Sequence, residues 1–276
     1  MKHPIEKKIP LMELFGPTIQ GEGAQIGVPT FFLRFGLCDY KCAMCDSMHA
    51  VKPQEVRRNA AWLTQQEIFN RFLQHYSTSG NAGWVTFSGG NPALYNLELL
   101  YGLFNKVGFR INVETQGTRY HPWLSLVDMV TVSPKSPGMK NPGGETSPDT
   151  LIEFLDCVYG LKGLSGKLET HIESTNAPEL CVKIVVFDEE DINYAEKIQV
   201  RLLQHKVHVP LYLSLGNPFL PGETTLNPTE MTANLMERYD NLTGKILSNQ
   251  FLSSGNCDVR FLPQLHVLAW GNEQGV

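Results

Sequence analysis

The sequence lacks the features that mark membrane, secreted and nucleic-acid-binding proteins. It contains no run of about 18 apolar residues, so no membrane span is expected. Its first residues carry charges without a following apolar stretch, which argues against a secretory signal peptide. The 23 basic residues are outnumbered by 28 acidic ones, which leaves no positive surplus for nucleic acid or an anionic membrane. A hydrophobic fraction of 42% excludes low-complexity disorder. We therefore expect a globular cytoplasmic protein.

The chain has six cysteines, and its length does not require them to form disulfides. A chain of 276 residues buries enough surface for a stable core, as one large domain or two small ones. In a reducing cytoplasm the thiols stay free. Cys157, Cys181 and Cys257 stand alone in apolar contexts, which is typical of small buried side chains. The other three are clustered, and such a cluster indicates metal ligands or catalytic thiols.

Hydrophobic periodicity predicts strands that alternate with helices. The predicted strands are 30–35, 84–87, 109–113, 129–132, 181–187, 209–215 and 258–262. The predicted helices are 65–76 after a capping box at Thr64, 97–107, 151–161, 188–203 and 228–239. Alternation of this kind is typical of a parallel sheet. We expect an α/β fold with about six to seven mainly parallel strands, arranged as a partial, TIM-like β/α barrel. Residues 134–148, rich in Pro, Gly and Ser, predict a mobile loop beside the site.

Polar motifs follow five of the predicted strands. They are Cys38, Ser88-Gly89-Gly90-Asn91-Pro92, Glu114-Thr115-Gln116-Gly117, Ser133-Pro134-Lys135 and Ser214-Leu215-Gly216-Asn217-Pro218. In parallel α/β folds the carboxyl ends of the strands meet at one edge, and the chemistry takes place there. The sequence therefore predicts one site built from all five motifs.

The clustered cysteines are Cys38, Cys42 and Cys45, with the spacing C-x3-C-x2-C. Three thiolates on a short loop can hold three irons of a [4Fe–4S] cube and leave the fourth iron open to another ligand. Thiolates also bind zinc, and His49 would complete a Cys3His zinc site. The sequence contains no second ligand pair with zinc-finger spacing. We favour an iron–sulfur cluster over zinc, and zinc over a chance clustering.

This cysteine spacing resembles the signature of the radical S-adenosylmethionine superfamily. Residues 88–92 resemble its GGEP motif, with Asn91 in place of the usual Glu. Other motifs are similar to those of the 7-carboxy-7-deazaguanine synthase family, in particular its Bacillus-like branch. They are FGPTIQGEG at 15–23, CDS at 45–47, ETQGT at 114–118, SPK at 133–135, PQLH at 263–266 and a C-terminal Trp-Gly-Asn. The resemblance runs from about Leu11 to the C-terminus.

The resemblance implies one radical S-adenosylmethionine domain over residues 1–276, with a substrate-binding segment at about 11–30 and a C-terminal extension at about 257–276. The implied reaction is a Mg2+-dependent ring contraction catalysed by a carbon–nitrogen lyase. It converts 6-carboxy-5,6,7,8-tetrahydropterin to 7-carboxy-7-deazaguanine and ammonia, in the biosynthesis of queuosine and other 7-deazapurines used in tRNA modification. A 5′-deoxyadenosyl radical, made from S-adenosylmethionine at a [4Fe–4S] cluster, removes the hydrogen at C6 of the substrate.

The resemblance also implies which residues hold the cofactors. Cys38, Cys42 and Cys45 bind the cluster, and no catalytic side chain beyond the cofactors is implied. Ser47 coordinates Mg2+, although from spacing alone it would be read as a turn hydroxyl. The residues implied to bind S-adenosylmethionine are Met44, Asp46, Gly90, Asn91, Ser133, Lys135, Ser214 and Asn217.

A second set of residues is implied to bind the substrate. They are Ile19, Gln20, Gly21, Glu22, Arg34, Ser88, Glu114, Gln116, Gln264 and His266. The forked guanidinium of Arg34 suits the substrate carboxylate, and its place inside the apolar run FFLRF indicates a special location. Gln20 and Glu22 suit the amide and amino edge of the pterin, and His266 is expected to close the pocket.

The resemblance implies partners as well: a small pterin substrate, a flavodoxin or ferredoxin as electron donor and a second copy of the chain, but no nucleic acid and no membrane. Two alternatives remain open. Another radical S-adenosylmethionine enzyme, such as a glycyl-radical activase, gives no account of Gln20, Glu22 or Ser47. A non-enzymatic iron–sulfur or zinc module has no use for polar motifs at five strand ends.

Overall fold

A nine-stranded sheet forms the centre of the computed structural model, which describes residues 7–159, 177–220, 224, 226–255, 257–273 and 275. The strand order is β3-β1-β2-β4-β5-β6-β7-β8-β9. From β2 to β9, every neighbouring pair is parallel. These strands are β2 (Pro29–Phe35), β4 (Trp84–Gly89), β5 (Arg110–Thr115), β6 (Met129–Val132), β7 (Glu179–Val186), β8 (Leu211–Leu215) and β9 (Val259–Leu262). The predicted partial barrel of mainly parallel strands is confirmed.

Two antiparallel strands extend the sheet beyond the predicted set. β1 (Ile9–Ile19) pairs with β2 on one side and β3 (Ala61–Leu63) on the other. β1 was not predicted as a strand, because Gly16 and Pro17 interrupt the alternation of its side chains. Its register with β2 shifts between Phe15 and Thr18, where these two residues lie. The N-terminal segment therefore belongs to the sheet itself.

Alternate side chains of the parallel strands face opposite sides of the sheet. On β2, Phe31, Leu33 and Phe35 are fully buried in the main apolar core. Arg34 points to the other side, where it lines a cavity. Ser88 of β4, in register with Arg34, lines the same cavity. The outer face of the sheet is thus apolar, whereas the inner face becomes polar toward the carboxyl ends of the strands.

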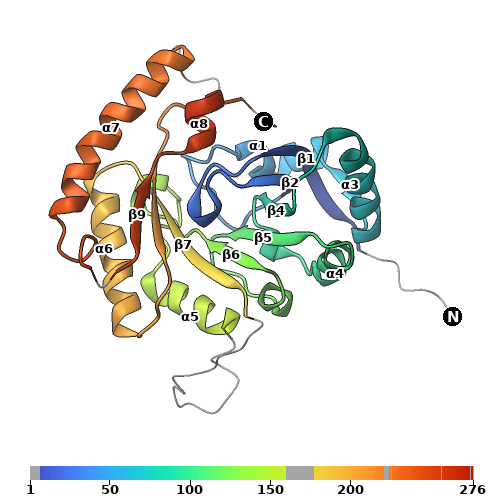
Figure 1. Ribbon diagram of the computed structural model, residues 1–276, viewed down its shortest axis with the longest axis horizontal. Coiled ribbons are helices and arrows are strands. Elements are labelled where there is room, and N and C mark those ends of the chain that lie inside the picture. Colours follow the sequence, from blue (N-terminus) through green and yellow to red (C-terminus); the bar gives the residue numbers. More distant parts are fainter. Residues whose placement is uncertain are drawn as a thin grey trace.

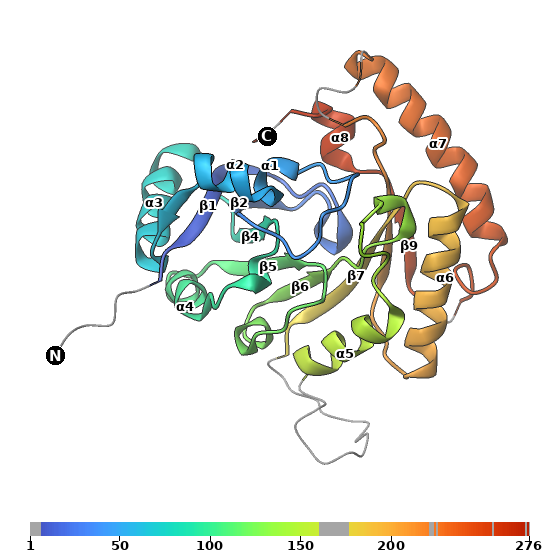
Figure 2. The ribbon, with the colours of Figure 1, turned by 180° about the vertical axis from the view of Figure 1, so that it is seen from behind.

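Helices cover the outer face of the curved sheet (Figures 1 and 2). The longer ones are α3 (Gln65–Ser79), α4 (Glu98–Lys106), α5 (Pro148–Val158), α6 (Glu189–Gln204) and α7 (Pro228–Ser248). The predicted capping box at Thr64 is present, because its hydroxyl accepts from the Glu67 amide while the Glu67 carboxylate accepts from the Thr64 amide. α7 is longer than predicted and begins with a second capping box at Asn227. The predicted end of the α5 helix at Leu161 lies outside the described residues.

Short helices border the carboxyl ends of the strands. α1 (Met48–Val51) and α2 (Pro53–Asn59) follow the cysteines, and α8 (Leu265–Trp270) follows β9. The segment predicted as a mobile loop contains a 3-10 turn at Pro137–Met139, and it is anchored by buried polar side chains. Ser136 donates to the carbonyl oxygen of Val185, and the amide of Gly138 donates to Asp191 at 2.7 Å. None of the helices in the described part of the chain is long and apolar enough to cross a bilayer.

Candidate active site

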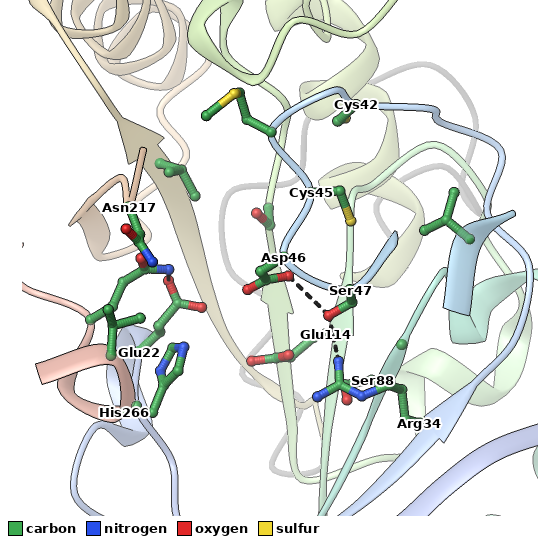
Figure 3. Close-up of a pocket in the computed structure, with 18 of the residues that line it drawn as sticks. Glu22, Arg34, Cys42, Cys45, Asp46, Ser47, Ser88, Glu114, Asn217 and His266 are labelled. Atoms are coloured by element: carbon green, nitrogen blue, oxygen red, sulfur yellow. Dashed lines mark hydrogen bonds between the residues drawn. The ribbon is translucent and has the colours of Figure 1, made fainter. Parts of the chain in front are cut away.

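One cavity at the carboxyl ends of the strands brings together all predicted site residues except Asn91 and Ser214. The residues it gathers are Ile19, Gln20, Gly21, Glu22, Arg34, Cys38, Cys42, Met44, Cys45, Asp46, Ser47, Ser88, Gly90, Glu114, Gln116, Ser133, Lys135, Asn217, Gln264 and His266. Their elements span the sheet from β1 to the helix after β9. Figure 3 shows Glu22 and His266 on one side of this cavity and Arg34 and Ser88 on the other.

The cysteine loop, residues 38–45, forms one end of the cavity. All three of its cysteines are free thiols, and Cys42 is buried. Burial raises the pKa of each thiol. For Cys45, burial and the neighbouring carboxylate of Asp46 raise the pKa to about 12. A metal that binds these sulfurs has to displace their protons.

Asp39 ties the cysteine loop to the strands behind it. Its Oδ1 accepts from Asn91 Nδ2 at 2.9 Å and from the side-chain amide of Gln116, and its Oδ2 accepts from the Thr118 hydroxyl. The Gln116 amide also donates to Cys38 Sγ at 3.3 Å, and the backbone N–H of Tyr40 donates to the same sulfur at 3.4 Å. The protein therefore fixes both the loop and one of its sulfurs with hydrogen bonds.

Two glycines allow the end of β4 to pack against the cysteine loop. A Cβ on Gly90 would lie 1.9 Å from the carbonyl oxygen of Leu37, just before Cys38. A Cβ on Gly89 would lie 2.2 Å from the carbonyl oxygen of Phe35, and its φ of +120° is itself unfavourable for other residues. The close approach explains why glycines occupy these positions.

These residues fit an iron–sulfur cluster better than zinc. Within the described residues, no group of three or more His, Cys, Asp and Glu side chains converges on a single metal ion. A cubane cluster does not need such convergence, because each thiolate binds a different iron. The proposed fourth zinc ligand, His49, pairs with Glu13 at 3.4 Å. The Cys3His arrangement is therefore not assembled in the described structure.

Arg34 and Ser47 are linked on the side of the cavity opposite Glu22 and His266 (Figure 3). Arg34 Nη1 donates to Ser47 Oγ at 2.6 Å, and Ser47 donates to Asp46 Oδ1 at 2.9 Å. Arg34 Nε forms an ion pair with Glu13 of β1. This pair orients the guanidinium, since Arg34 and Glu13 are both largely buried.

Ser88 offers a hydrogen-bonding group to a ligand. It is buried on the inner face of β4 and lines the cavity. Its Oγ has no hydrogen-bond partner among the described residues. Buried hydroxyls are nearly always hydrogen-bonded, so a partner bound in the cavity is the natural explanation.

Glu22 and Lys183 form an ion pair at the other end of the cavity. Lys183 Nζ lies 2.7 Å from Glu22 Oε2, and both side chains are about one-tenth exposed (9% and 11%). Gln264 Nε2 donates to Glu22 Oε1 at 2.8 Å. Although burial opposes ionisation, Lys183 and these hydrogen bonds lower the pKa of Glu22 to about 2. The carboxylate is therefore ionised throughout the physiological range.

The loop that carries Glu22 is fixed from both sides. Gln20 Nε2 donates to Glu114 Oε1 at 3.0 Å, and Gln20 Oε1 accepts from the backbone amide of Gly21 at 2.8 Å. The amide of Leu265 donates to the carbonyl oxygen of Gly21 at 2.9 Å. A Cβ on Gly21 would lie 2.1 Å from Nδ1 of His266, so only glycine allows the imidazole to pack here.

Known proteins that match this chain over nearly its full length identify its family. The chain is 34% identical over 274 residues to the 7-carboxy-7-deazaguanine synthase of Bacillus cereus, covering 98% of this chain and 99% of the relative. It is 35% identical over 272 residues to that of Bacillus subtilis, with the same coverage. The chain belongs to the 7-carboxy-7-deazaguanine synthase family. No protein-family profile matches it.

Solved structures agree with this assignment at the level of the fold. The crystal structure of QueE from Escherichia coli matches with a TM-score of 0.56 and 21% identity, covering 92% of this chain and 93% of that one. Streptococcus suis SuiB, solved with S-adenosylmethionine bound, matches with a TM-score of 0.52 and 14% identity over 84% of this chain and 50% of that one. These two solved structures thus share the overall fold of this chain.

Two residues expected to contact S-adenosylmethionine do not line the cavity. The side chain of Asn91 is fully buried, where it donates to Asp39 and accepts from the Ala93 amide and the Thr115 hydroxyl. Ser214 is 1% exposed on β8, the strand next to the edge strand β9, and is flanked in register by Val185 and Leu262. Asn91 therefore supports the cysteine loop from behind, and Ser214 lies below the cavity.

Sequence reasoning missed two charged residues of the site. Lys183 lines the cavity from the apolar strand β7, and Glu13 of β1 pairs with Arg34. A signal for Lys183 was present, because a lysine inside the run Leu180-Cys181-Val182-Lys183-Ile184-Val185-Val186 is as unusual as Arg34 in its own strand. Glu13 gave no signal, because β1 was not expected to be a strand.

Proposed function

We propose that this chain is a radical S-adenosylmethionine enzyme that converts 6-carboxy-5,6,7,8-tetrahydropterin to 7-carboxy-7-deazaguanine and ammonia. The observation that carries the proposal is a single cavity that joins the cysteine loop to Arg34, Ser88 and the Gln20–Glu22 loop. The family supports it, because relatives that match over nearly their whole length carry this enzyme name. The product would serve queuosine or other 7-deazapurine biosynthesis.

Cys38, Cys42 and Cys45 would hold a [4Fe–4S] cluster. When bound, the reduced cluster would split S-adenosylmethionine into methionine and a 5′-deoxyadenosyl radical that takes the hydrogen from C6 of the substrate. S-adenosylmethionine would lie along Met44, Asp46, Gly90 and the backbone of Asn91, and between Ser133, Lys135 and Asn217. Lys135 Nζ donates to Ser133 Oγ at 3.1 Å, which holds these two groups together at the cavity wall.

Ser47 would bind Mg2+ beside the cysteine loop. Its hydroxyl is buried and hydrogen-bonded to Asp46, which brings two hard oxygen donors together. Mg2+ usually keeps several waters and takes one or two protein oxygens, so this small set is sufficient. Arg34 donates to the same hydroxyl, and its guanidinium would be shared with the substrate carboxylate.

The substrate would lie between Arg34 and the Glu22 end of the cavity. Arg34 and Ser88 would hold its carboxylate side, while Gln20, Glu22, Glu114 and the backbone of Ile19 and Gly21 would accept or donate hydrogen bonds at the pyrimidine edge. Gln116, whose amide donates to Asp39 and Cys38, would contact the substrate at the cysteine end. Gln264 and His266 would close the pocket. Loss of ammonia alone balances substrate and product, so the hydrogen taken from C6 has to be returned later in the reaction.

The wider setting follows the family resemblance. We propose a flavodoxin or ferredoxin as the electron donor and a homodimer as the assembly. We also propose a single domain in which residues 11–30 and 257–276 complete the substrate end. β1 and α8 support this role, since residues of both segments line the cavity.

Anaerobic turnover tests the proposal directly. Reconstituted protein is mixed with dithionite, S-adenosylmethionine, Mg2+ and 6-carboxytetrahydropterin, and products are followed by mass spectrometry. We expect 7-carboxy-7-deazaguanine, and none when S-adenosylmethionine is left out. Formation of 5′-deoxyadenosine without 7-carboxy-7-deazaguanine would assign a different substrate. Colourless protein that retains one zinc would contradict the iron–sulfur chemistry.

A further inference from the structure

Lys183 is a buried cation in an otherwise apolar stretch of β7. Val182 and Ile184 on either side of it are fully buried in the core beneath the helices. Lys183 points the opposite way, onto the inner face of the sheet, where its side chain is only 9% exposed and lines the cavity. An ammonium in such a place is unfavourable unless carboxylates compensate it.

Lys183 faces carboxylates from three separate elements. It pairs with Glu22 at 2.7 Å, and Glu114 of β5 and Asp46 beside the cysteine loop also stabilise its charge. These carboxylates raise the pKa of Lys183 above its ordinary value in spite of burial. On its other side, Glu22 accepts from Gln264 and faces His266 of α8. Lys183 is thus the only cation within hydrogen-bonding distance of Glu22 among the described ion pairs.

We propose that Lys183 is a positioning residue: it holds Glu22 ionised and aimed along the cavity wall, so that this end of the cavity accepts N–H donors of the substrate. An ionised carboxylate only accepts hydrogen bonds, whereas a protonated one also donates. The amino and ring N–H groups of a pterin are donors of the matching kind. The pterin as ligand rests on the proposed function, but the charge state of Glu22 does not.

Removal of the Lys183 ammonium would raise the pKa of Glu22. In the intact protein, the attraction of Lys183, the nearby His266 and the hydrogen bonds from Lys183 and Gln264 together outweigh the effect of burial, and the pKa of Glu22 is about 2. Without Lys183, burial would remain, and burial alone raises the pKa of a carboxyl group. Glu22 would then take up a proton at a higher pH than in the intact protein and lose acceptor capacity. His266, which also lowers the pKa of Glu22, would offset only part of this change, because its contribution is smaller than that of Lys183.

Infrared titration of the cluster-loaded full chain tests the charge of Glu22 without substrate. The variants are Lys183→Met, which removes the charge at similar length, and Lys183→Arg, which keeps it. The carboxyl band of Glu22 is assigned by its absence in Glu22→Gln. We expect Glu22 to stay ionised well below about pH 4.3, the ordinary pKa of Glu, in the wild type and Lys183→Arg, but to take up a proton above that pH in Lys183→Met. Ionised Glu22 in Lys183→Met over the same range would overturn the proposal.

Steady-state kinetics test the consequence for binding. We expect Lys183→Met to raise the KM for 6-carboxytetrahydropterin by about tenfold or more, most strongly at low pH, with a smaller change in kcat. Lys183→Arg should restore much of the loss. A loss of affinity that is equal at all pH values and not restored by Arg would indicate a structural role only and contradict the proposal. If the wild type does not turn over the pterin, the proposed function fails, while the infrared titration still decides the role of Lys183.

The double variant Glu22→Gln/Lys183→Met serves as a folding control. It removes both charges together, so it leaves no unpaired buried ion. We expect it to melt at a higher temperature than Glu22→Gln, in which Lys183 keeps its charge and loses the carboxylate. Equal melting temperatures would show that Lys183 and Glu22 are not coupled, which the proposal does not allow.

Discussion

At one end of the cavity the ligand atoms are three thiols on a loop of eight residues. At the other end they are an ion pair and two amides from elements as far apart as β1 and α8. Burial raises the pKa of the thiols, so they are protonated in the protein alone, whereas the pair of Glu22 and Lys183 is fully charged. The cysteine end thus needs a bound metal before its thiols lose their protons. At the Glu22 end, folding alone produces the charged ion pair.

The two ends also differ in how far apart their residues lie along the chain, and this decides which end the sequence could predict. The cysteines lie within eight residues of one another, so their spacing alone indicates a cluster site. Glu22 and Lys183 are separated by 161 positions, and Glu22 and Gln264 by 242. Their contact depends on the sheet order that brings β7 beside the N-terminal loop, and no local pattern encodes that order.

The parallel strands were predicted because each is a short apolar run, and polar motifs follow five of the seven predicted strands. β1 was missed, because Gly16 and Pro17 break its alternation. Asn91 was placed correctly in a motif after β4, but its side chain turned out to bind Asp39 behind the cavity wall. The position of a motif along the chain could be predicted, whereas the direction of a side chain within it could not.

The largest expected effect comes from Cys45→Ala. Because each thiolate binds its own iron, loss of one should reduce the iron content from about four per chain to near zero and abolish turnover. Iron and sulfide analysis checks this, with Cys257→Ala as a matched control outside the cavity. The Glu22 carboxyl should keep its low pKa in Cys45→Ala. A raised Glu22 pKa in this variant would contradict the independence of the two ends.

Gly21→Ala should affect only the Glu22 end of the cavity. The new Cβ would lie 2.1 Å from His266 Nδ1, so the imidazole has to move away from the loop that carries Glu22. We expect the KM for the pterin to rise roughly tenfold, about 1.4 kcal/mol, with unchanged iron content. Gly83→Ala, where a Cβ meets no atom within 4 Å, is the control and should behave as wild type. A fall in iron content in Gly21→Ala would show that the two ends are coupled.

Asn91→Asp should produce the smallest effect on turnover of these three variants, confined to the cysteine end. It would place a second carboxylate at hydrogen-bond distance from Asp39 and remove one of the donors to Asp39. We expect a loss of roughly 1–3 kcal/mol in the free energy of unfolding and weaker retention of the cluster. Asn96→Asp is the control, since Asn96 is exposed just before α4 and its side-chain oxygen accepts from the Glu98 amide, as an aspartate oxygen also would. Equal free energies of unfolding for the wild type and Asn91→Asp would show that the hydrogen bond from Asn91 to Asp39 does not stabilise the cysteine loop.

The central claim is that one cavity brings a radical generated at the cysteine end to C6 of a pterin held at the Glu22 end. The most direct measurement is anaerobic turnover with 6-carboxytetrahydropterin that carries deuterium at C6. We predict that deuterium appears at the 5′ carbon of 5′-deoxyadenosine or of recovered S-adenosylmethionine, together with 7-carboxy-7-deazaguanine. Formation of 7-carboxy-7-deazaguanine without deuterium in either adenosyl compound would contradict the claim.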